Sequence, residues 1–471
     1  MKRCLLTLCL ILFALGTFAQ TSIIKGQNES YANFLLQVKK YSEQFTYSEQ
    51  LLGEIQTDQQ GSFRIELDLK ETQLVFLPLG IYKGFLFVEP GKEYEVKLPP
   101  LQDKKPADKL NPYFEEEELM LGIAGNNSKE LNYLIRNFDD QLDGFINQNF
   151  RRIYRKKEGS VGHEFAGKLK SEYQHTNNSF FRNYVEYRLG LLEFLANPQA
   201  FGKMENRYFK NRKVQFYNPA YTSLFKKLYG NFLTGYFDRK EGPAIRKAFA
   251  NKNPYQNMTA LLAKYESYQD ENLRDMLLLC GLFDGYTRKF FSRNDLLSIS
   301  QVMENRSAHP YNRTLAKNIT KHLNHLRPGH PAPDFHLPGE LASANLEHYK
   351  GKHLYLSFCN TQSYACQKDF EELEKLYQQF GKEVEFLTIA TDWDPKTFEA
   401  FQKNHSYSWT LLHIGDQQHI AREYNVRAYP TYFLIDEKGN IVKAPAPGPK
   451  EHIEQDFIRI RRDAIRKAYR K

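Results

Sequence analysis

The sequence predicts a multidomain α+β protein with an N-terminal β-sandwich, a helical middle region and a C-terminal α/β domain. Three observations predict it: short alternating strands near the N-terminus, helical apolar spacing through the middle, and buried strands interleaved with helices at the end. The chain has 471 residues, of which 41% are hydrophobic and 26% are charged. It is therefore long enough to bury two or three globular cores.

Residues 1–19 have the pattern of a secretory signal peptide. A basic pair precedes the apolar run Leu5–Leu15, and small residues lead up to Ala19, after which we expect cleavage. The run is too short to span a bilayer, and neither cysteine in it follows the small residues of a lipoprotein signal. We expect a periplasmic or secreted chain that is not a lipoprotein and has no membrane span after cleavage.

The charge pattern argues against a nucleic-acid partner. Loss of Lys2 and Arg3 with the signal reduces the formal charge from +9 to +7. The basic clusters at 151–157 and 459–471 lie on predicted helices, where a solvated face explains them. The histidines show no zinc spacing with the cysteines, and no glycine loop suited to phosphate occurs. We therefore expect no metal site and no cofactor.

Residues 20–108 are expected to form the β-sandwich. Apolar and polar residues alternate over 63–67 and again over 94–98, each time after a glycine-bearing turn. Several such short strands, separated by turns, are typical of a small sandwich.

Residues 109–326 are expected to be helical, following a charged, proline-bearing linker at 101–112. Asn127 and Glu130 resemble a capping box at the start of a helix. Apolar residues then keep helical spacing up to Ile146, and the same spacing recurs later in the region. The region shows no fixed repeat period, which disfavours a helical solenoid.

The C-terminal domain, residues 327–471, begins at the clearest boundary in the chain. Three prolines between residues 328 and 333 prevent a helix from continuing. A buried strand at 354–358 then leads into a helix that opens near Ser363. The elements expected after it are a strand at 384–389, another apolar strand directly after Tyr429-Pro430, a hairpin turn at 436–440 and a closing helix from about Lys450.

This order of elements resembles the thioredoxin fold and, more narrowly, the extracytoplasmic thiol-disulfide oxidoreductases of the TlpA and ResA kind. In those proteins the helix opens with Cys-x-x-Cys. The four matching positions here are Ser363, Tyr364, Ala365 and Cys366. The sequence also departs from the family at Gln362, where an aromatic residue is usual, and at Cys359, where tryptophan is usual.

The missing first cysteine decides the functional prediction. At a helix N-terminus such a thiol has its pKa lowered from about 8.5 to about 3.5–7.5, so it attacks disulfides as a thiolate. The Ser363 hydroxyl neither ionises usefully there nor forms a disulfide with Cys366. We therefore expect a redox-silent domain in which Cys366 is an inert thiol, with nothing to lower its pKa.

The alternative is a thiol-disulfide oxidoreductase that uses Cys366, with or without Cys359, so the sequence leaves open whether the chain is an enzyme. Cys359 lies seven residues before Cys366, at the end of the strand beneath the helix. A disulfide between them requires Cα atoms within about 7 Å and converging Cβ vectors. Cys280 lies in an apolar helical pattern and is expected to be a structural thiol. Asp392 and Asp394 are explained by loop solvation or helix capping.

The resemblance implies that the Tyr429–Pro430 bond is cis and that the backbone of Tyr429 is free to pair with an extended peptide. With Thr431 beside them, and with Ser363 and Tyr364 across the groove, these residues are predicted to hold an extended polypeptide or an envelope protein client. A third possibility is a structural envelope component whose contacts come from the sandwich and the helices.

Overall fold

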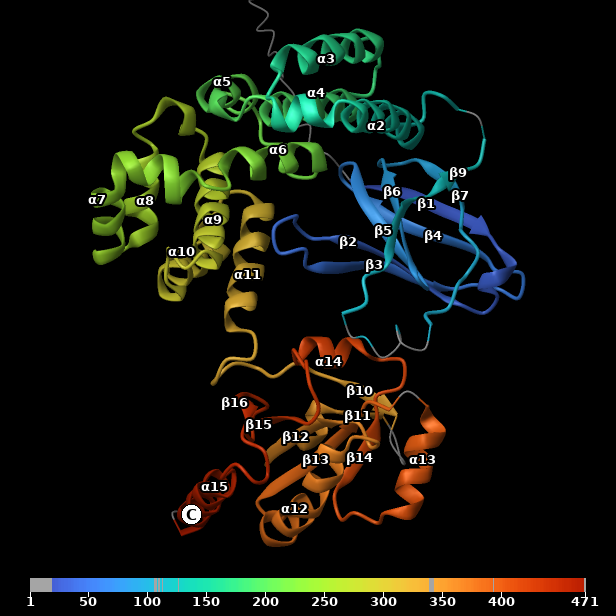
Figure 1. Cartoon of the computed structure of the whole chain (residues 1–471), viewed down its shortest axis with the longest axis vertical. Helices are drawn as coiled ribbons and strands as arrows, with labels where there is room; N and C mark the ends of the chain where they lie inside the picture. Colours follow the sequence, from blue (N-terminus) through green and yellow to red (C-terminus); the bar gives the residue numbers. More distant parts are fainter. Residues whose placement is uncertain are drawn as a thin grey trace, which may run out of the picture. The chain divides into compact units, whose positions relative to one another are not determined.

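The computed structural model describes residues 19–471 except 106–107, 109–110, 112, 126, 339–342, 393 and 470–471. The predicted signal peptide therefore lies outside the described residues, apart from its last position. The chain divides into two compact units (Figure 1). The first comprises the chain up to Gln102 together with Glu117–Ile319, and the second comprises Asp103–Glu116 together with Thr320–Lys471.

The N-terminal strands form two sheets that share one core. One sheet has the order β4-β1-β7-β9 and the other β3-β2-β5-β6-β8. The strands are β1 (Gln20–Gln27), β2 (Leu35–Tyr41), β3 (Glu49–Gln56), β4 (Ser62–Leu69), β5 (Gln73–Leu79), β6 (Tyr82–Val88), β7 (Glu93–Lys97), β8 (Glu117–Met120) and β9 (Gly122–Ile123). The alternation predicted over 63–67 and 94–98 is confirmed, because the apolar side chains of both runs are buried. Strands β8 and β9 extend the sheets beyond the predicted end at residue 108.

Ten α-helices follow in the described part of the middle region. They are α2 (Leu131–Gln148), α3 (Gly159–Tyr173), α4 (Ser179–Ala196), α5 (Phe201–Tyr208), α6 (Pro219–Tyr229), α7 (Phe237–Ala250), α8 (Pro254–Leu262), α9 (Glu271–Thr287), α10 (Arg293–Arg306) and α11 (Pro310–Asn324). Helix α2 begins three residues later than predicted. Glu130 is its N-cap and accepts a hydrogen bond from the Tyr133 amide. Asn127 instead forms a local turn, in which its side chain accepts from the Lys129 amide at 3.0 Å.

Buried polar side chains join the sandwich to the helices. Asn132 of α2 is 3% exposed, and its side chain accepts from the Phe87 amide at 2.7 Å and donates to the Phe87 carbonyl at 2.9 Å. Glu43, which is fully buried, accepts from the Asn318 side chain at 3.1 Å. These bonds satisfy groups that would otherwise be costly to bury, so the sandwich and the helices form one unit.

The second unit is built on a five-stranded sheet with the order β14-β13-β12-β15-β16. Its strands and helices are β10 (His336–Pro338), β11 (Ser343–Asn345), β12 (His353–Cys359), α12 (Tyr364–Phe380), β13 (Val384–Ala390), α13 (Pro395–Asn404), β14 (Thr410–His413), α14 (His419–Glu423), β15 (Thr431–Ile435), β16 (Ile441–Ala446) and α15 (Glu454–Tyr469). Strand β12 is central, parallel to β13 and antiparallel to β15. The predicted strands, hairpin turn and closing helix are confirmed.

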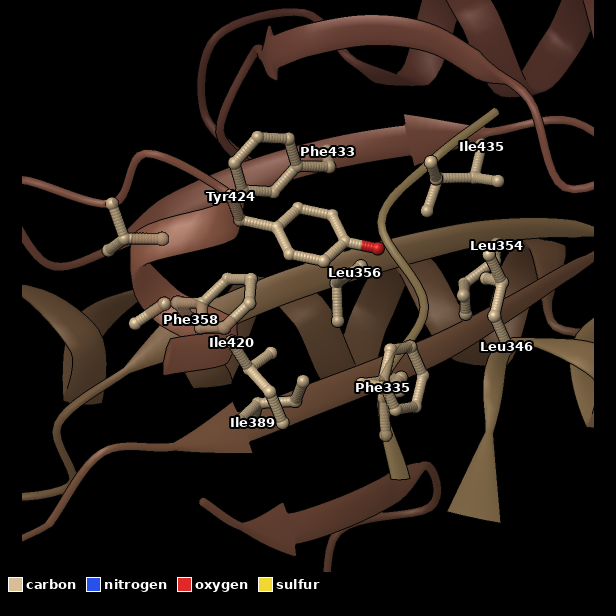
Figure 2. Packing of buried hydrophobic residues seen from close by; sticks show 14 of the residues in the cluster. Phe335, Leu346, Leu354, Leu356, Phe358, Ile389, Ile420, Tyr424, Phe433 and Ile435 are labelled. Carbon is tan, nitrogen blue, oxygen red and sulfur yellow. The ribbon is translucent and has the colours of Figure 1, made fainter. Parts of the chain in front are cut away.

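The two faces of this sheet bury different side chains of β12. Leu354, Leu356 and Phe358 face a cluster covered by α14 and the entry segment (Figure 2). The Tyr424 ring lies in that cluster, and its hydroxyl donates to the Pro333 carbonyl at 2.6 Å.

Tyr355 and Cys359 belong to the opposite face, where α12 and α15 pack (Figure 1). Because side chains alternate along a strand, the residue after Phe358 must lie beneath α12. This places the Cys359 sulfur on the motif side of the sheet. None of the helices in the described part of the chain combines the length and the hydropathy that a membrane crossing needs.

Candidate functional site

The site lies where β12 passes into α12, at the end of the sheet. Ser363 is the N-cap residue of α12, with extended backbone angles of φ −74° and ψ 123°. Its side chain makes no capping bond, while its amide donates to the Asn360 carbonyl at 3.0 Å. Tyr364 and Ala365, the next two motif residues, are exposed, whereas Cys366 is fully buried. The motif therefore stands at the amino end of the helix, as the sequence predicts.

A buried carboxyl group anchors the loop between β12 and α12. Asp392, which follows β13, accepts from the Thr361 amide at 3.1 Å and from the Thr361 hydroxyl at 2.6 Å. Both residues are 2% exposed. The expectation that Asp392 is a solvated loop residue or a cap is therefore wrong, whereas Asp394 caps α13 by accepting from the Lys396 amide at 3.1 Å. Nothing in the sequence indicated this bond, because Thr361 and Asp392 lie 31 residues apart on two loops.

The structure brings the two predicted cysteines together as neighbouring thiols, each of which shifts the pKa of the other. Cys359 and Cys366 are both 0% exposed, and neither is part of a disulfide. The hydrogen bond from the Cys359 thiol is the largest cause that lowers the pKa of Cys366, and burial opposes it. The Asn360 amide and the Ser363 hydroxyl lower that pKa further. Burial raises the pKa of Cys359 well above its ordinary value, with the bond to Cys366 as the next cause.

This arrangement corrects one sequence-based expectation. Cys366 does not lack groups that lower its pKa, because the Cys359 thiol, the Asn360 amide and the Ser363 hydroxyl each do so. The sequence could not show this, since one of the donors is the thiol that replaces the usual tryptophan at position 359. Cys280, on α9, is a half-buried free thiol, and its burial raises the pKa of that thiol.

The Tyr429–Pro430 step lies beside the motif. Its peptide bond is cis, and Thr431 directly after it begins β15, opposite Phe358 of β12. Tyr429 is half-buried and packs against the clusters on both faces of the sheet. Burial raises the pKa of the Tyr429 hydroxyl, and the charge of Cys366 adds to this effect. Within the described residues, the structure records no hydrogen-bond partner for the Tyr429 amide.

An exposed aromatic ring completes the surface next to the motif. Tyr364 is 69% exposed, and the ammonium group of Lys368 lies 4.5 Å from the centre of its ring. A large exposed ring with a cation over one face is suited to a partner rather than to a core. In the described residues, no group of three or more histidine, cysteine or acidic side chains is placed to hold a metal ion.

Comparison with known proteins assigns this domain to a family. The sequence profile of the AhpC/TSA family matches residues 328–444. Thiol-disulfide oxidoreductase ResA of Geobacillus kaustophilus is 31% identical over 137 residues, which cover 28% of this chain and 78% of that protein. The thioredoxin-like protein YneN of Bacillus subtilis is 30% identical over 122 residues, which cover 25% of this chain and 69% of that protein. The chain belongs to the ResA-type thioredoxin-like family.

A solved structure is similar over the same share of the chain. The thioredoxin domain of a thiol-disulfide oxidoreductase from Bacteroides vulgatus is 20% identical, with 28% of this chain and 96% of that chain covered and a TM-score of 0.26. The family profile and the ResA-type relatives confirm the resemblance predicted for the C-terminal domain, residues 327–471. The motif of this ResA-type domain carries a hydroxyl at residue 363 and a buried thiol at residue 366, with a second buried thiol at residue 359.

Proposed function

We propose that this chain is a periplasmic or secreted envelope protein whose ResA-type domain binds extended polypeptide without exchanging disulfides with it. The observation that carries the proposal is the motif itself. Ser363 holds the partly exposed first position with a hydroxyl, and the thiol of Cys366 is 0% exposed. The signal peptide predicted for residues 1–19 supports the envelope location.

The redox half of the proposal follows from sulfur chemistry. Disulfide exchange requires a thiolate that attacks one sulfur of the client disulfide and then forms a mixed disulfide with that sulfur. An alcohol oxygen at position 363 can do neither step. The lowered pKa of Cys366 favours its thiolate, but that thiolate lies beneath the helix start with no exposed surface. Reactivity requires both thiolate character and access, and only the first is present.

The binding half follows from what remains exposed. The Tyr429 amide has no recorded partner among the described residues, and it lies two residues before β15, where an added extended chain could pair with it. The exposed ring of Tyr364, in the first turn of the motif helix, offers a contact for an apolar or aromatic client side chain. None of these contacts needs a thiol.

The test uses a client that has no thiols. Fluorescent reduced and carboxymethylated α-lactalbumin is titrated with the full chain, and binding is followed by anisotropy. We expect the Cys359→Ala/Cys366→Ala double variant to bind as the wild type does. Tyr364→Ala should weaken binding about fivefold, because an aromatic contact contributes about 1 kcal/mol.

The matched control is Tyr469→Ala, which removes a ring that is 88% exposed on α15 of the same unit. It should leave the affinity unchanged. Absence of binding by the wild type, or loss of binding in the double cysteine variant, would contradict the proposal.

A second candidate function is disulfide exchange through Cys366 and Cys359, and it is favoured by the closeness of the two thiols, of which Cys359 lowers the pKa of Cys366. The Cys366 thiolate would attack a client disulfide, form a mixed disulfide and release one client thiolate. Cys359, after losing its proton, would attack the Cys366 sulfur and release the second client thiol. The client gains two electrons, and the chain is left with one internal disulfide.

Mass spectrometry of the alkylated, non-reduced protein separates the two functions. A stoichiometric Cys359–Cys366 disulfide after incubation with a disulfide client supports exchange. Alkylation of both thiols only after unfolding, with no linked peptide, supports the binding function.

A further inference from the structure

The segment Tyr113–Glu116, here called the strap, belongs to the same compact unit as the thioredoxin-like domain. The chain leaves the first unit after Gln102 and re-enters it at Glu117, and the described residues between these points belong to the unit of residues 320–471. The sequence predicts only a linker over most of this stretch. The strap nevertheless contacts residues of the thioredoxin-like domain that lie more than three hundred positions away in the sequence.

Two contacts dock the strap on the loop that precedes the cis-proline. The Tyr113 hydroxyl donates to the side-chain oxygen of Asn425 at 3.1 Å. The Arg427 guanidinium lies 5.4 Å from the centre of the Tyr113 ring, and its Nε donates to the same Asn425 oxygen at 3.1 Å. The three side chains therefore form one cluster, in which Tyr113 supplies both a ring and a hydroxyl.

Local bonds shape the strap so that it presents this tyrosine. The Asn111 side chain accepts from the Tyr113 amide at 2.9 Å, and the Asn111 carbonyl accepts from the Phe114 amide at 3.1 Å. Lys104 lies 4.5 Å from the centre of the Phe114 ring and 3.9 Å from the Glu116 carboxylate. A loop that is ordered before it binds loses less conformational entropy on docking.

The docking site flanks the surface assigned to clients. Asn425 and Arg427 lie four and two residues before Tyr429. Tyr113 is also close enough to Tyr429 for its charge to contribute to the raised pKa of that residue, after burial and Cys366. A polypeptide that pairs with the Tyr429 amide must therefore pass the place where the strap lies.

We propose that the strap is an internal ligand that competes with clients for the surface formed by Asn425, Arg427 and Tyr429. This inference rests on the proposed polypeptide binding and gives it a substrate class: extended segments with an aromatic side chain beside acidic residues. The strap has that chemistry itself, since Glu115 and Glu116 follow its two aromatic residues. Arg427 is the cation that recognises the ring of Tyr113.

The competition is weak enough to be overcome by a client. A single neutral hydrogen bond and one exposed cation–π contact together correspond to about a tenfold preference for the docked state. Removing both should therefore tighten client binding about tenfold, because a site that is free in only a fraction of molecules binds with affinity reduced by that fraction.

The experiment uses the full chain and a fluorescein-labelled peptide with the sequence of residues 111–118. We expect Tyr113→Ala to bind this peptide about tenfold more tightly than the wild type. The Tyr113→Ala/Arg427→Ala double variant should lose that gain, because the surface no longer recognises the ring. Tyr133→Ala, which removes a 53% exposed tyrosine from α2, is the matched control and should behave as the wild type.

Hydrogen exchange of the same proteins tests the strap independently of whether the proposed polypeptide binding is correct. Faster exchange over residues 113–116 in Tyr113→Ala, together with tighter peptide binding, supports the proposal that the strap competes with clients. This holds even if carboxymethylated α-lactalbumin does not bind. Equal exchange and equal peptide affinity in the wild type and Tyr113→Ala overturn it, even if that client binds both proteins.

Discussion

The bond between Thr361 and Asp392 should control both the stability of the thioredoxin-like unit and its client surface. Thr361→Val keeps the shape of the side chain and the backbone amide bond but removes the hydroxyl that donates to Asp392 at 2.6 Å. Both residues are 2% exposed, so water cannot replace the lost donor. We expect the unit to lose about 1–3 kcal/mol of unfolding free energy, the cost of leaving a buried acceptor without its partner.

The chain provides its own probe for this measurement. Its two tryptophans, at positions 393 and 409, both fall within residues 320–471, so intrinsic fluorescence during urea unfolding reports on this unit. Trp409 is 6% exposed and donates to the Thr388 hydroxyl at 2.9 Å, so its emission should shift on unfolding. Client affinity should fall in parallel, because the loop that carries Tyr364 loses its anchor.

The control is Thr397→Val in α13, where the structure records no hydrogen bond of the hydroxyl among the residues that it describes. It should change the unfolding free energy by less than about 0.5 kcal/mol, as surface substitutions do. An equally small change in Thr361→Val would refute the idea that Asp392 holds the motif loop. A loss of stability with unchanged client affinity would show that the Thr361–Asp392 bond stabilises the unit without affecting client binding.

Two further predictions concern the thiols and the first unit. Cys359→Ala should raise the pKa of Cys366, because it removes the largest cause that lowers it, and the thiolate absorbance near 240 nm should then appear at higher pH than in Cys280→Ala. The folded pKa of Cys366 lies below its ordinary value, so the stability it contributes is present above the unfolded pKa and is lost as the pH falls through the folded one. Asn132→Ala should destabilise the first unit by about 1–3 kcal/mol in calorimetry, since it leaves both backbone groups of Phe87 without their partner, and unchanged melting would contradict joint folding of sandwich and helices.

The sequence is most informative where one periodicity extends over a whole element. Leu354, Leu356 and Phe358 alternate with residues that face α12, and the strand, its neighbours and the motif helix all follow from that spacing. The position of Ser363 at the helix start follows as well, because the order of strand, loop and helix leaves few alternatives.

Contacts between distant segments could not be predicted in the same way. The lowered pKa of Cys366 depends on which groups the fold places near its sulfur, and the bond from Thr361 to Asp392 joins two loops. Asn127 matches a helix cap in sequence, yet α2 begins after Glu130. The Glu130 side chain is the one that accepts from a free amide of the first turn, that of Tyr133. Tyr113 directly follows the linker predicted over 101–112, in a region expected to be helical, so nothing in the sequence indicated its bond to Asn425.

The central claim is that an oxygen at residue 363 silences the domain toward disulfides while leaving its fold intact. Reduction of insulin by dithiothreitol, followed by turbidity, tests it with the unaltered chain and with Ser363→Cys. We predict that the wild-type chain leaves the rate at that of the reductant alone and that Ser363→Cys accelerates it. Acceleration by the wild type that disappears in Cys366→Ala would contradict the account.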